Sequence, residues 1–304
     1  MKIWFKLIRI QPNIVHAHTP KAGLVGMVAA CLARVPVRLY TVHGVPLETA
    51  TGLRFFLLWL SDCIAFVCAT DLLCVSHSVK AKIQHLKLPR ARKARVLLEG
   101  TACGVDDEKK FAFFPQEKLS KRAYIREKYS IPEKAIVMGF IGRFVKDKGI
   151  AELVDAWRKV SQTEENFWVI MVGCKDSCGG TDNRTLQDIQ DEKQWISTGW
   201  DEDTAQYYSA MDFLVLPSYR EGFPTVVLEA AALEVPSVVT DATGCIDAVI
   251  HEQTGLVVPV KDSVALADAF QQYIECPTLI SQHGRAARIR VAKYFQRRTV
   301  QEAI

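Results

Sequence analysis

Short β-rich runs alternate with helical patterns along the whole chain, and this alternation constrains its fold more than any other feature. Runs such as "NIVHAH", "PVRLYTVHG", "DLLCVS", "AIVMGFIGR" and "FWVIMVG" are each followed by a stretch of helical periodicity. Strands joined through helices run parallel, and parallel sheets are covered by helices on both faces. With 49% hydrophobic and 24% charged residues, the composition is that of a globular chain. The sequence therefore predicts an α/β protein.

The alternation falls into two series, which we interpret as two domains. In the first series we expect helices over residues 2–11, 21–33, 52–69 and 78–87. In the second series we expect a helix after "EGFP" and further helices over residues 149–160, 184–193, 201–210, 263–275 and 278–304. The second series is a complete doubly wound domain, whereas the first has only about three strand–helix units. The predicted limits are 1–110, a linker over 111–134, 135–285, and a last helix over 286–304 that returns to the first domain.

The nine cysteines indicate a reducing compartment. They form no C-x-x-C pair, and the three-residue spacer between Cys174 and Cys178 has no second pair or histidine nearby to complete a metal site. Lys6 and Arg9 interrupt the only apolar run near Met1, so no secretory signal is visible. We expect reduced, mostly buried thiols and a cytoplasmic protein.

The most hydrophobic segment, residues 53–75, leaves two interpretations open. Ser61 and Asp62 divide it into pieces shorter than the roughly 20 residues of a membrane span. A buried helix leading into the strand "DLLCVS" is the favoured interpretation. The alternative is a helix that lies in the plane of a membrane surface.

The first candidate binding residues follow the strand "AIVMGFIGR". Ligands of open parallel sheets bind beyond the carboxyl ends of the strands. In "GFIGRFVKDKG", Arg143 follows the strand and Lys148 sits at the start of the next helix. A guanidinium and an ammonium at this position suit a diphosphate, although a solvated loop would carry the same residues.

The second candidate is the stretch "REGFPTVVLEAAA". Pro224 suits the first helical position, so Thr225, Val226 and Val227 would offer unpaired N–H groups to an anion. Glu221 precedes this turn, and Glu229 lies about 7.5 Å along the helix with its side chain leaning back. Both carboxylates can therefore reach one ligand with phosphate and hydroxyl groups. Otherwise, one glutamate pairs with the helix dipole and the other with a buried cation.

A third candidate, "TDATGCIDAVIHEQTGLVVP", places Thr243 and Gly244 in a loop after a strand. A loop that needs a permissive backbone explains these residues equally well.

The motifs "GRFVKDKG", "EGFPTVVLE" and "TGLVVP", in this order, resemble the retaining glycosyltransferases of family 4. The segment "PNIVHAHTPKAGLVGMVAACLARVPVRLYTVHG" looks like the middle of that family's acceptor domain, so the resemblance covers nearly the whole chain. It implies the GT-B fold, in which two Rossmann-like domains face a cleft, the first of them incomplete here. The implied reaction moves a sugar from a nucleotide-diphosphate sugar, expected to be UDP-linked, to a polysaccharide or lipid-linked glycan.

The resemblance also implies roles for single residues. Arg143 and Lys148 would bind the diphosphate, while Glu221 would bind the donor sugar beside backbone groups of Gly222 and Phe223. Thr225 and Val226, behind Pro224, would cap a phosphate, Glu229 would hold the ribose, and His43 would face the donor sugar. The anomeric configuration would be retained without a metal or another cofactor, the nucleotide sugar being a co-substrate.

Two other polar groups could mimic a metal site. His16 and His18 share one face of a strand but have no third metal ligand nearby. Asp201 and Asp203 form an Asp-x-Asp, which we place at a helix start, where carboxylates pair with the dipole.

The segment 80–95 is basic, with no nearby acid. Its cations either form a solvated helix face or contact an anionic membrane surface or lipid diphosphate; they are Lys80, Lys82, Lys87, Arg90, Arg92, Lys93 and Arg95. Nucleic acid is disfavoured, because no aromatic interleaving accompanies the charge.

The chain departs from the family at its start, where the expected strand and Gly-rich loop are lacking. We therefore expect a truncated coding sequence or a misassigned start, with the strand "NIVHAH" at a sheet edge. Two alternative functions stay open: a non-catalytic donor-binding remnant, and a nucleotide-sugar epimerase of the same fold. Glu221 and Glu229 argue against the epimerase.

Overall fold

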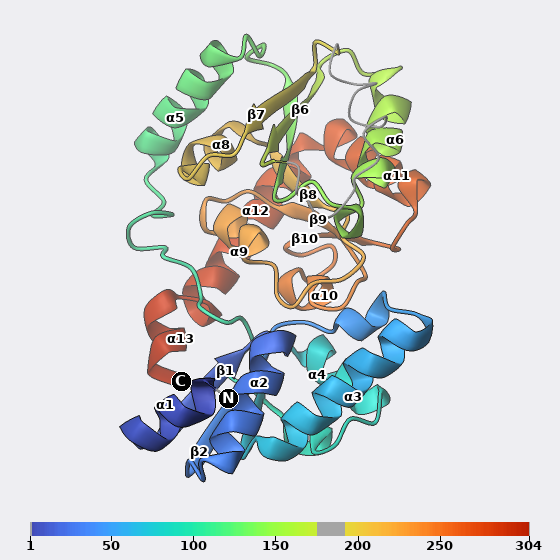
Figure 1. Cartoon of the computed structure of the whole chain (residues 1–304). Helices are drawn as coiled ribbons and strands as arrows, with labels where there is room; N and C mark the ends of the chain where they lie inside the picture. Colours follow the sequence, from blue (N-terminus) through green and yellow to red (C-terminus); the bar gives the residue numbers. More distant parts are fainter. Residues whose placement is uncertain (1, 175–191, 304) are drawn as a thin grey trace.

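A computed structural model describes residues 2–174 and 192–303 and contains two parallel sheets with helices around them (Figure 1). The first sheet has the order β1-β2-β3-β4 and the second the order β10-β9-β8-β5-β6-β7. The two parallel α/β units predicted from the alternation are thereby confirmed.

The first sheet consists of β1 (Ile14–His18), β2 (Val37–Val42), β3 (Asp71–Cys74) and β4 (Arg95–Val96). Its helices are α1 (Lys2–Ile10), α2 (Pro20–Leu32), α3 (Gly52–Cys68) and α4 (His77–His85), with short 3-10 turns at Pro46–Glu48 and Ala91–Lys93. Among the described residues β1 pairs only with β2, so "NIVHAH" lies at a sheet edge, as predicted. The sequence analysis missed β4, which is too short to produce a strand pattern.

The second sheet contains β5 (Ile136–Ile141), β6 (Phe167–Val172), β7 (Trp195–Gly199), β8 (Phe213–Leu216), β9 (Ser237–Thr240) and β10 (Gly255–Val258). Its helices are α6 (Ile150–Ser161), α8 (Thr204–Ala210), α9 (Thr225–Ala232), α10 (Cys245–Ala248), α11 (Ser263–Glu275) and α12 (Pro277–Tyr294). Taken in chain order, these strands have the Rossmann order 3-2-1-4-5-6, so the doubly wound prediction is correct. The helix expected over 184–193 lies almost entirely outside the described residues.

Two helix predictions need correction. The segment interpreted as a linker contains the helix α5 (Pro115–Lys128). Its sequence shows little apolar periodicity, because arginine side chains rather than an apolar stripe attach the helix to the second domain. The single helix expected over 278–304 is divided into α12 and α13 (Arg297–Ala303). At the break, the carbonyl of Phe295 accepts from the N–H of Val105, and Arg297 donates to Val105. The first domain's chain therefore supplies the hydrogen bonds that an unbroken helix would make.

Burial also differs from two expectations. The helix at the start of segment 53–75 is not buried on all sides, since α3 exposes a row of apolar side chains. The thiols are not mostly buried either: Cys31, Cys103, Cys174 and Cys276 are exposed, whereas only Cys74 and Cys245 are buried among the described cysteines.

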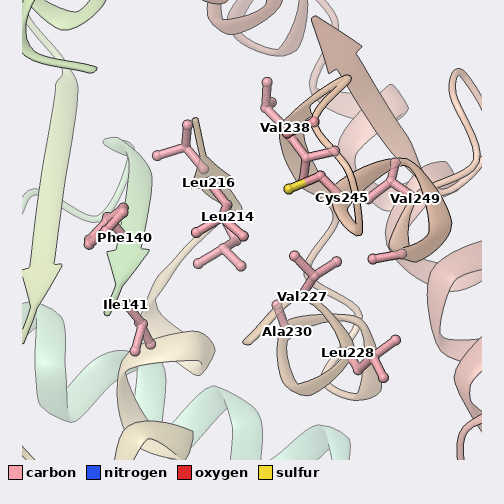
Figure 2. Close-up of a cluster of buried hydrophobic side chains, with 14 of the residues drawn as sticks. Phe140, Ile141, Leu214, Leu216, Val227, Leu228, Ala230, Val238, Cys245 and Val249 are labelled. Carbon is pink, nitrogen blue, oxygen red and sulfur yellow. The ribbon is translucent and has the colours of Figure 1, made fainter. Parts of the chain in front are cut away.

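The core of the second domain lies between its sheet and α9. Figure 2 shows Leu214 and Leu216 of β8 beside Val227 of α9 and Val238 of β9. These four side chains are at most 2% exposed, and the three alanines at Ala230–Ala232 allow α9 to pack closely. The packing holds the first turn of α9 at the carboxyl edge of the sheet.

Candidate active site

The candidate site lies where the strand order of the second sheet reverses. β5 pairs with β6 on one side and with β8 on the other, and the connections leave in opposite directions. Such a switch point opens a crevice beyond the carboxyl ends of the strands. Arg143 and Lys148 follow β5, and Glu221 follows β8. The residues that the sequence analysis assigned to diphosphate and sugar are therefore on adjacent loops.

Lys148 and Glu221 are in direct contact. The ammonium of Lys148 lies 2.5 Å from Oε1 of Glu221, and the hydroxyl of Ser218 donates to the same oxygen at 2.7 Å. Both charged side chains are largely buried, at 20% and 15% exposed, so water screens the pair only partly. Lys148 belongs to a 3-10 turn (Lys146–Lys148) rather than to the start of α6 as expected. This local group places one cation and one carboxylate at the crevice.

The turn after Glu221 lies against the first domain. A Cβ atom added to Gly222 would stand 1.9 Å from the carbonyl oxygen of His43. Gly244, with φ +84, also lies close to the backbone of Gly222. The N–H of Glu221 donates to the carbonyl of Thr243 at 2.8 Å. Gly222 is therefore required for close approach, and Thr243 and Gly244 support the turn.

A second contact between the domains joins α10 to the start of α4. The carboxylate of Asp247 accepts hydrogen bonds from the N–H groups of His77 at 3.0 Å and Ser78 at 3.2 Å. The hydroxyl of Ser78 donates to the same carboxylate and accepts from the N–H of Gly244 at 2.7 Å. A carboxylate at a helix N-terminus is stabilised by the unpaired N–H groups there. We call these four residues the α10–α4 contact.

The helix α9 begins one residue later than expected. Pro224 precedes it, with ψ 105 in the extended range, and its carbonyl accepts from Val227 at 3.2 Å. Val227 is thus not available to an anion, contrary to the sequence analysis. Within the described residues the N–H groups of Thr225 and Val226 make no hydrogen bond. Two of the three predicted donors remain at the mouth of the helix.

Glu229 lies in the second turn of α9, and Oε2 accepts a hydrogen bond from the hydroxyl of Tyr208 at 2.8 Å. Burial raises the pKa of Glu229, while the hydrogen bond from Tyr208 and the charges of Lys110 and Arg297 act in the opposite direction. A bond from a neutral phenol leaves the carboxylate capable of accepting from a further hydroxyl. The alternative that a glutamate pairs with a buried cation holds for Glu221, which pairs with Lys148, whereas the partner of Glu229 among the described residues is a neutral phenol.

His43 belongs to a row of histidines at the carboxyl edge of the first sheet. Its Nε2 lies 2.8 Å from Nδ1 of His18, whose ring centroid is 4.0 Å from that of His16. His16 and His18 thus share one face of β1, as predicted. Burial, and then the neighbouring imidazoles, lowers the pKa of His43. His43 is therefore neutral at neutral pH and can both donate and accept one hydrogen bond.

The remaining predicted residues take distinct positions. Arg143 is exposed at the end of β5. The ring of Phe223 packs on Phe295, with centroids 5.3 Å apart. Asp203 lies at the N-terminus of α8, and the carboxylate of Asp201 accepts from its N–H at 2.9 Å, so their placement at a helix start is correct.

Sequence reasoning missed three contributors to the site. Ser218 and Tyr208 hold the two glutamates, and the ion pair of Arg220 with Asp147, at 2.7 Å, links the loops after β8 and β5. Ser218 and Arg220 stand inside the conspicuous "PSYREG" loop, so proximity along the chain could have indicated them. Tyr208 comes from a different helix and carries no such signal.

Within the described residues, no group of three or more His, Cys, Asp or Glu side chains is placed to hold a metal ion. The described helices also include none with the length and apolarity that crossing a membrane requires.

Two family models match the chain over the two domains. The model described as "Glycosyl transferases group 1" matches residues 121–290, and that described as "Glycosyltransferase Family 4" matches residues 1–103. The candidate site lies in the first region and the histidine row in the second.

Curated relatives of the chain agree with the two family matches. The chain is 33% identical over 294 residues to the capsular polysaccharide biosynthesis glycosyltransferase CapM of Staphylococcus aureus, covering 97% of this chain and 76% of the relative. It is 27% identical to a UDP-Gal:alpha-D-GlcNAc-diphosphoundecaprenol alpha-1,3-galactosyltransferase of Escherichia coli, covering 85% and 65%.

Solved structures share the fold. HepE of Anabaena, crystallised with UDP, superposes with a TM-score of 0.81 at 20% identity, covering 99% of this chain and 79% of that one. The GT-B fold expected from the sequence is thereby confirmed. With both domains matched by family models and a relative at 33% identity, this chain belongs to the glycosyl transferases group 1 and family 4, and is a glycosyltransferase.

Proposed function

We propose that this protein transfers a sugar from a UDP-sugar to a polysaccharide or lipid-linked glycan, with retention of the anomeric configuration. The observation that carries the proposal is the contact of the Lys148–Glu221 group with the first domain through Gly222 and His43. A site for a charged donor thus adjoins His43 of the other domain. The name of the Escherichia coli relative specifies a UDP-linked donor and a diphosphoundecaprenol acceptor, which supports both substrate classes.

The proposed reaction breaks the bond between the anomeric carbon and the donor phosphate and forms one to the acceptor oxygen on the same face. The acceptor proton moves to an oxygen of the departing diphosphate. Lys148 and Arg143 would stabilise the charge that develops on that diphosphate, together with the N–H groups of Thr225 and Val226. Glu221 would hold the sugar hydroxyls and Glu229 the ribose, with Gly222 and Phe223 contributing backbone groups. No metal takes part in this proposal.

The two glutamates test the proposal because they are assigned different roles. Glu229→Ala removes a hydrogen bond to a charged group, so UDP affinity should fall by roughly tenfold or more. Glu221→Ala should leave UDP binding nearly unchanged and mainly lower turnover. Titration calorimetry with UDP, followed by a transfer assay on membrane fractions, measures both effects.

Glu252→Ala is the matched control, because this carboxylate is on the same domain with 72% of its side chain exposed. Glu252→Ala should change neither the affinity for UDP nor the turnover. Equal and small effects of the two site variants would contradict the assigned roles. UDP binding without transfer in the wild type would favour the donor-binding remnant instead.

We also propose that the enzyme works in the cytoplasm at the inner face of the membrane, where thiols stay reduced and a lipid-linked acceptor is within reach. The basic segment 80–95 is the candidate contact with anionic lipid. Lys87, Arg92 and Lys93 are exposed there, whereas Arg95 pairs with Asp71 at 3.4 Å.

A further inference from the structure

Helix α3 has an apolar face that no described residue covers. Leu53, Phe56, Leu57, Leu60, Ile64 and Val67 are between 41% and 73% exposed. Their spacing places all six on one side of the helix, along about 20 Å of its length. The opposite side is buried through Asp62, Ala65 and Phe66. A surface helix normally carries polar residues on its outer face, so this arrangement is inverted.

The apolar face continues onto the neighbouring helices. Ile64 of α3 lines a groove of about 840 Å³ together with Leu24, Val25, Val28 and Leu32 of α2 and Trp4 of α1. Ile3, Phe5 and Ile8 of α1 are also exposed. A contiguous apolar surface of this kind marks a site of interaction. We call it, with the six residues of α3, the α3 face.

The first domain, which carries the α3 face, is rich in positive charge. Residues 2–47 contain six lysines and arginines and no acidic residue, and residues 2–98 contain fourteen cations against three acids. Of these acids Asp62 is buried on the inner side of α3, and Asp71 pairs with Arg95. Residues 99–304 have the opposite balance, with 24 cations and 31 acids. An occupant that combines apolar and anionic groups therefore suits the α3 face and the domain that carries it.

We propose that the α3 face is the surface by which this enzyme docks on an anionic lipid bilayer, with α3 lying in the membrane plane. A bilayer offers both acyl chains for the six apolar residues and acidic headgroups for the surrounding cations. A second copy of the chain would oppose one cationic surface to another identical one, which disfavours self-association.

The position of α3 relative to the candidate site fits this docking. α3 begins at Gly52, three residues after Thr49, whose hydroxyl accepts a hydrogen bond from Arg220 at 3.1 Å. The indole of Trp59 donates to the carbonyl of Leu86 at the end of α4, which joins the α3 face to the basic segment 80–95. Figure 1 shows α3 at the outside of the lower domain. Docking through α3 would thus bring lipid close to the loop that contacts the site.

Vesicle flotation tests the proposal with Leu57→Glu and Leu60→Glu, each of which puts a charge on the exposed face. The wild type should bind phosphatidylglycerol-containing vesicles more strongly than pure phosphatidylcholine ones at about 0.1 M salt. Each variant should lose binding by about tenfold or more, since a buried apolar contact is replaced by a charge. Ile289→Glu is the control, because Ile289 on α12 is 67% exposed and the charge change is the same; it should bind like the wild type.

Leu57→Trp provides a second readout that does not depend on weakened binding. Its additional fluorescence should be quenched by brominated acyl chains in anionic vesicles. UDP affinity of Leu57→Glu should equal that of the wild type, which separates this test from that of the catalytic proposal.

Three outcomes would overturn the proposal. In the first, the wild type fails to bind anionic vesicles. In the second, Leu57→Glu binds as well as the wild type, while Lys93→Glu in the basic segment abolishes binding. In the third, sedimentation shows a wild-type dimer that Leu57→Glu dissociates, which would assign the α3 face to a second copy.

Discussion

The carboxyl group of Asp62 lies on the inner side of α3, where this residue is only 8% exposed. Burial raises its pKa from 3.8 to about 6. A buried carboxyl without a cation favours the protonated form, because desolvation penalises the charge. α3 thus exposes six apolar residues and buries one acid. The pKa of Asp62 therefore depends on how α3 packs against the rest of the first domain.

The raised pKa makes a pH-dependent prediction for Asp62→Asn. The native state binds more protons than the unfolded state between about pH 4 and pH 6, so this contribution to stability is present at low pH and is lost as the pH rises. The free energy of unfolding of the wild type minus that of Asp62→Asn should therefore decrease across this window, by about 3 kcal/mol at most. Urea unfolding at several pH values measures the difference, and a constant difference would contradict the prediction.

At the scale of elements, α5 shows how a segment without an apolar stripe can be fixed in place. Arg126 of α5 is 6% exposed at its side chain and lies 2.9 Å from Asp212, which also accepts from the N–H of Val137. The guanidinium donates in addition to the carbonyls of Glu133 and Ala135, both at 2.9 Å. α5 is thus anchored to the start of β5 and β8 by a buried ion pair.

Arg126→Met should destabilise the second domain by about 3 kcal/mol, because it leaves Asp212 with a buried charge and fewer partners. Arg122, at 2.8 Å from Asp212, compensates in part. The matched control is Lys121→Met, whose partner Glu117 is half exposed; an exposed pair contributes less than about 1 kcal/mol. The midpoint of urea unfolding measures both effects, and equal midpoints for the two variants would refute the role of Arg126.

At the scale of the molecule, polar contacts hold the two domains together around the site. The α10–α4 contact and the bond from Arg220 to Thr49 cross between the domains, and the close approach of Gly222 to His43 depends on them. Contacts of this kind resemble transient interfaces, for which relative domain motion is the default expectation. A few hydrogen bonds thus hold the two domains together in this arrangement.

Combining Ser78→Ala with Asp247→Asn should open the cleft. We expect a larger radius of gyration by small-angle X-ray scattering and a roughly tenfold or greater loss of transfer. UDP affinity should stay within about twofold, since the predicted donor residues all lie on the second domain. Asp71→Asn, which removes an exposed ion pair within the first domain, should leave the scattering unchanged. An unaltered radius of gyration in the double variant would show that other contacts control closure.

The sequence by itself determined the two parallel α/β units and the switch-point loops after β5 and β8, and it indicated the candidate residues of the site. These features follow from local periodicity and from motifs such as "EGFPTVVLE", which are contiguous in the chain. The helix α9 begins one residue later than predicted, so the N–H group of Val227 is not available as a hydrogen-bond donor to a ligand. The assigned roles of Arg143, Lys148, Glu221, Glu229 and His43 stay predictions.

Only the tertiary structure decided which partners these residues have. The contacts of Glu229 with Tyr208, of Lys148 with Glu221 and of Asp247 with Ser78 join residues that are distant in the chain. The outward orientation of the apolar row on α3 also depended on the sheet, because an apolar helix pattern does not specify which side is covered. Periodicity reports the faces of an element, whereas pairing and exposure arise only when elements pack together.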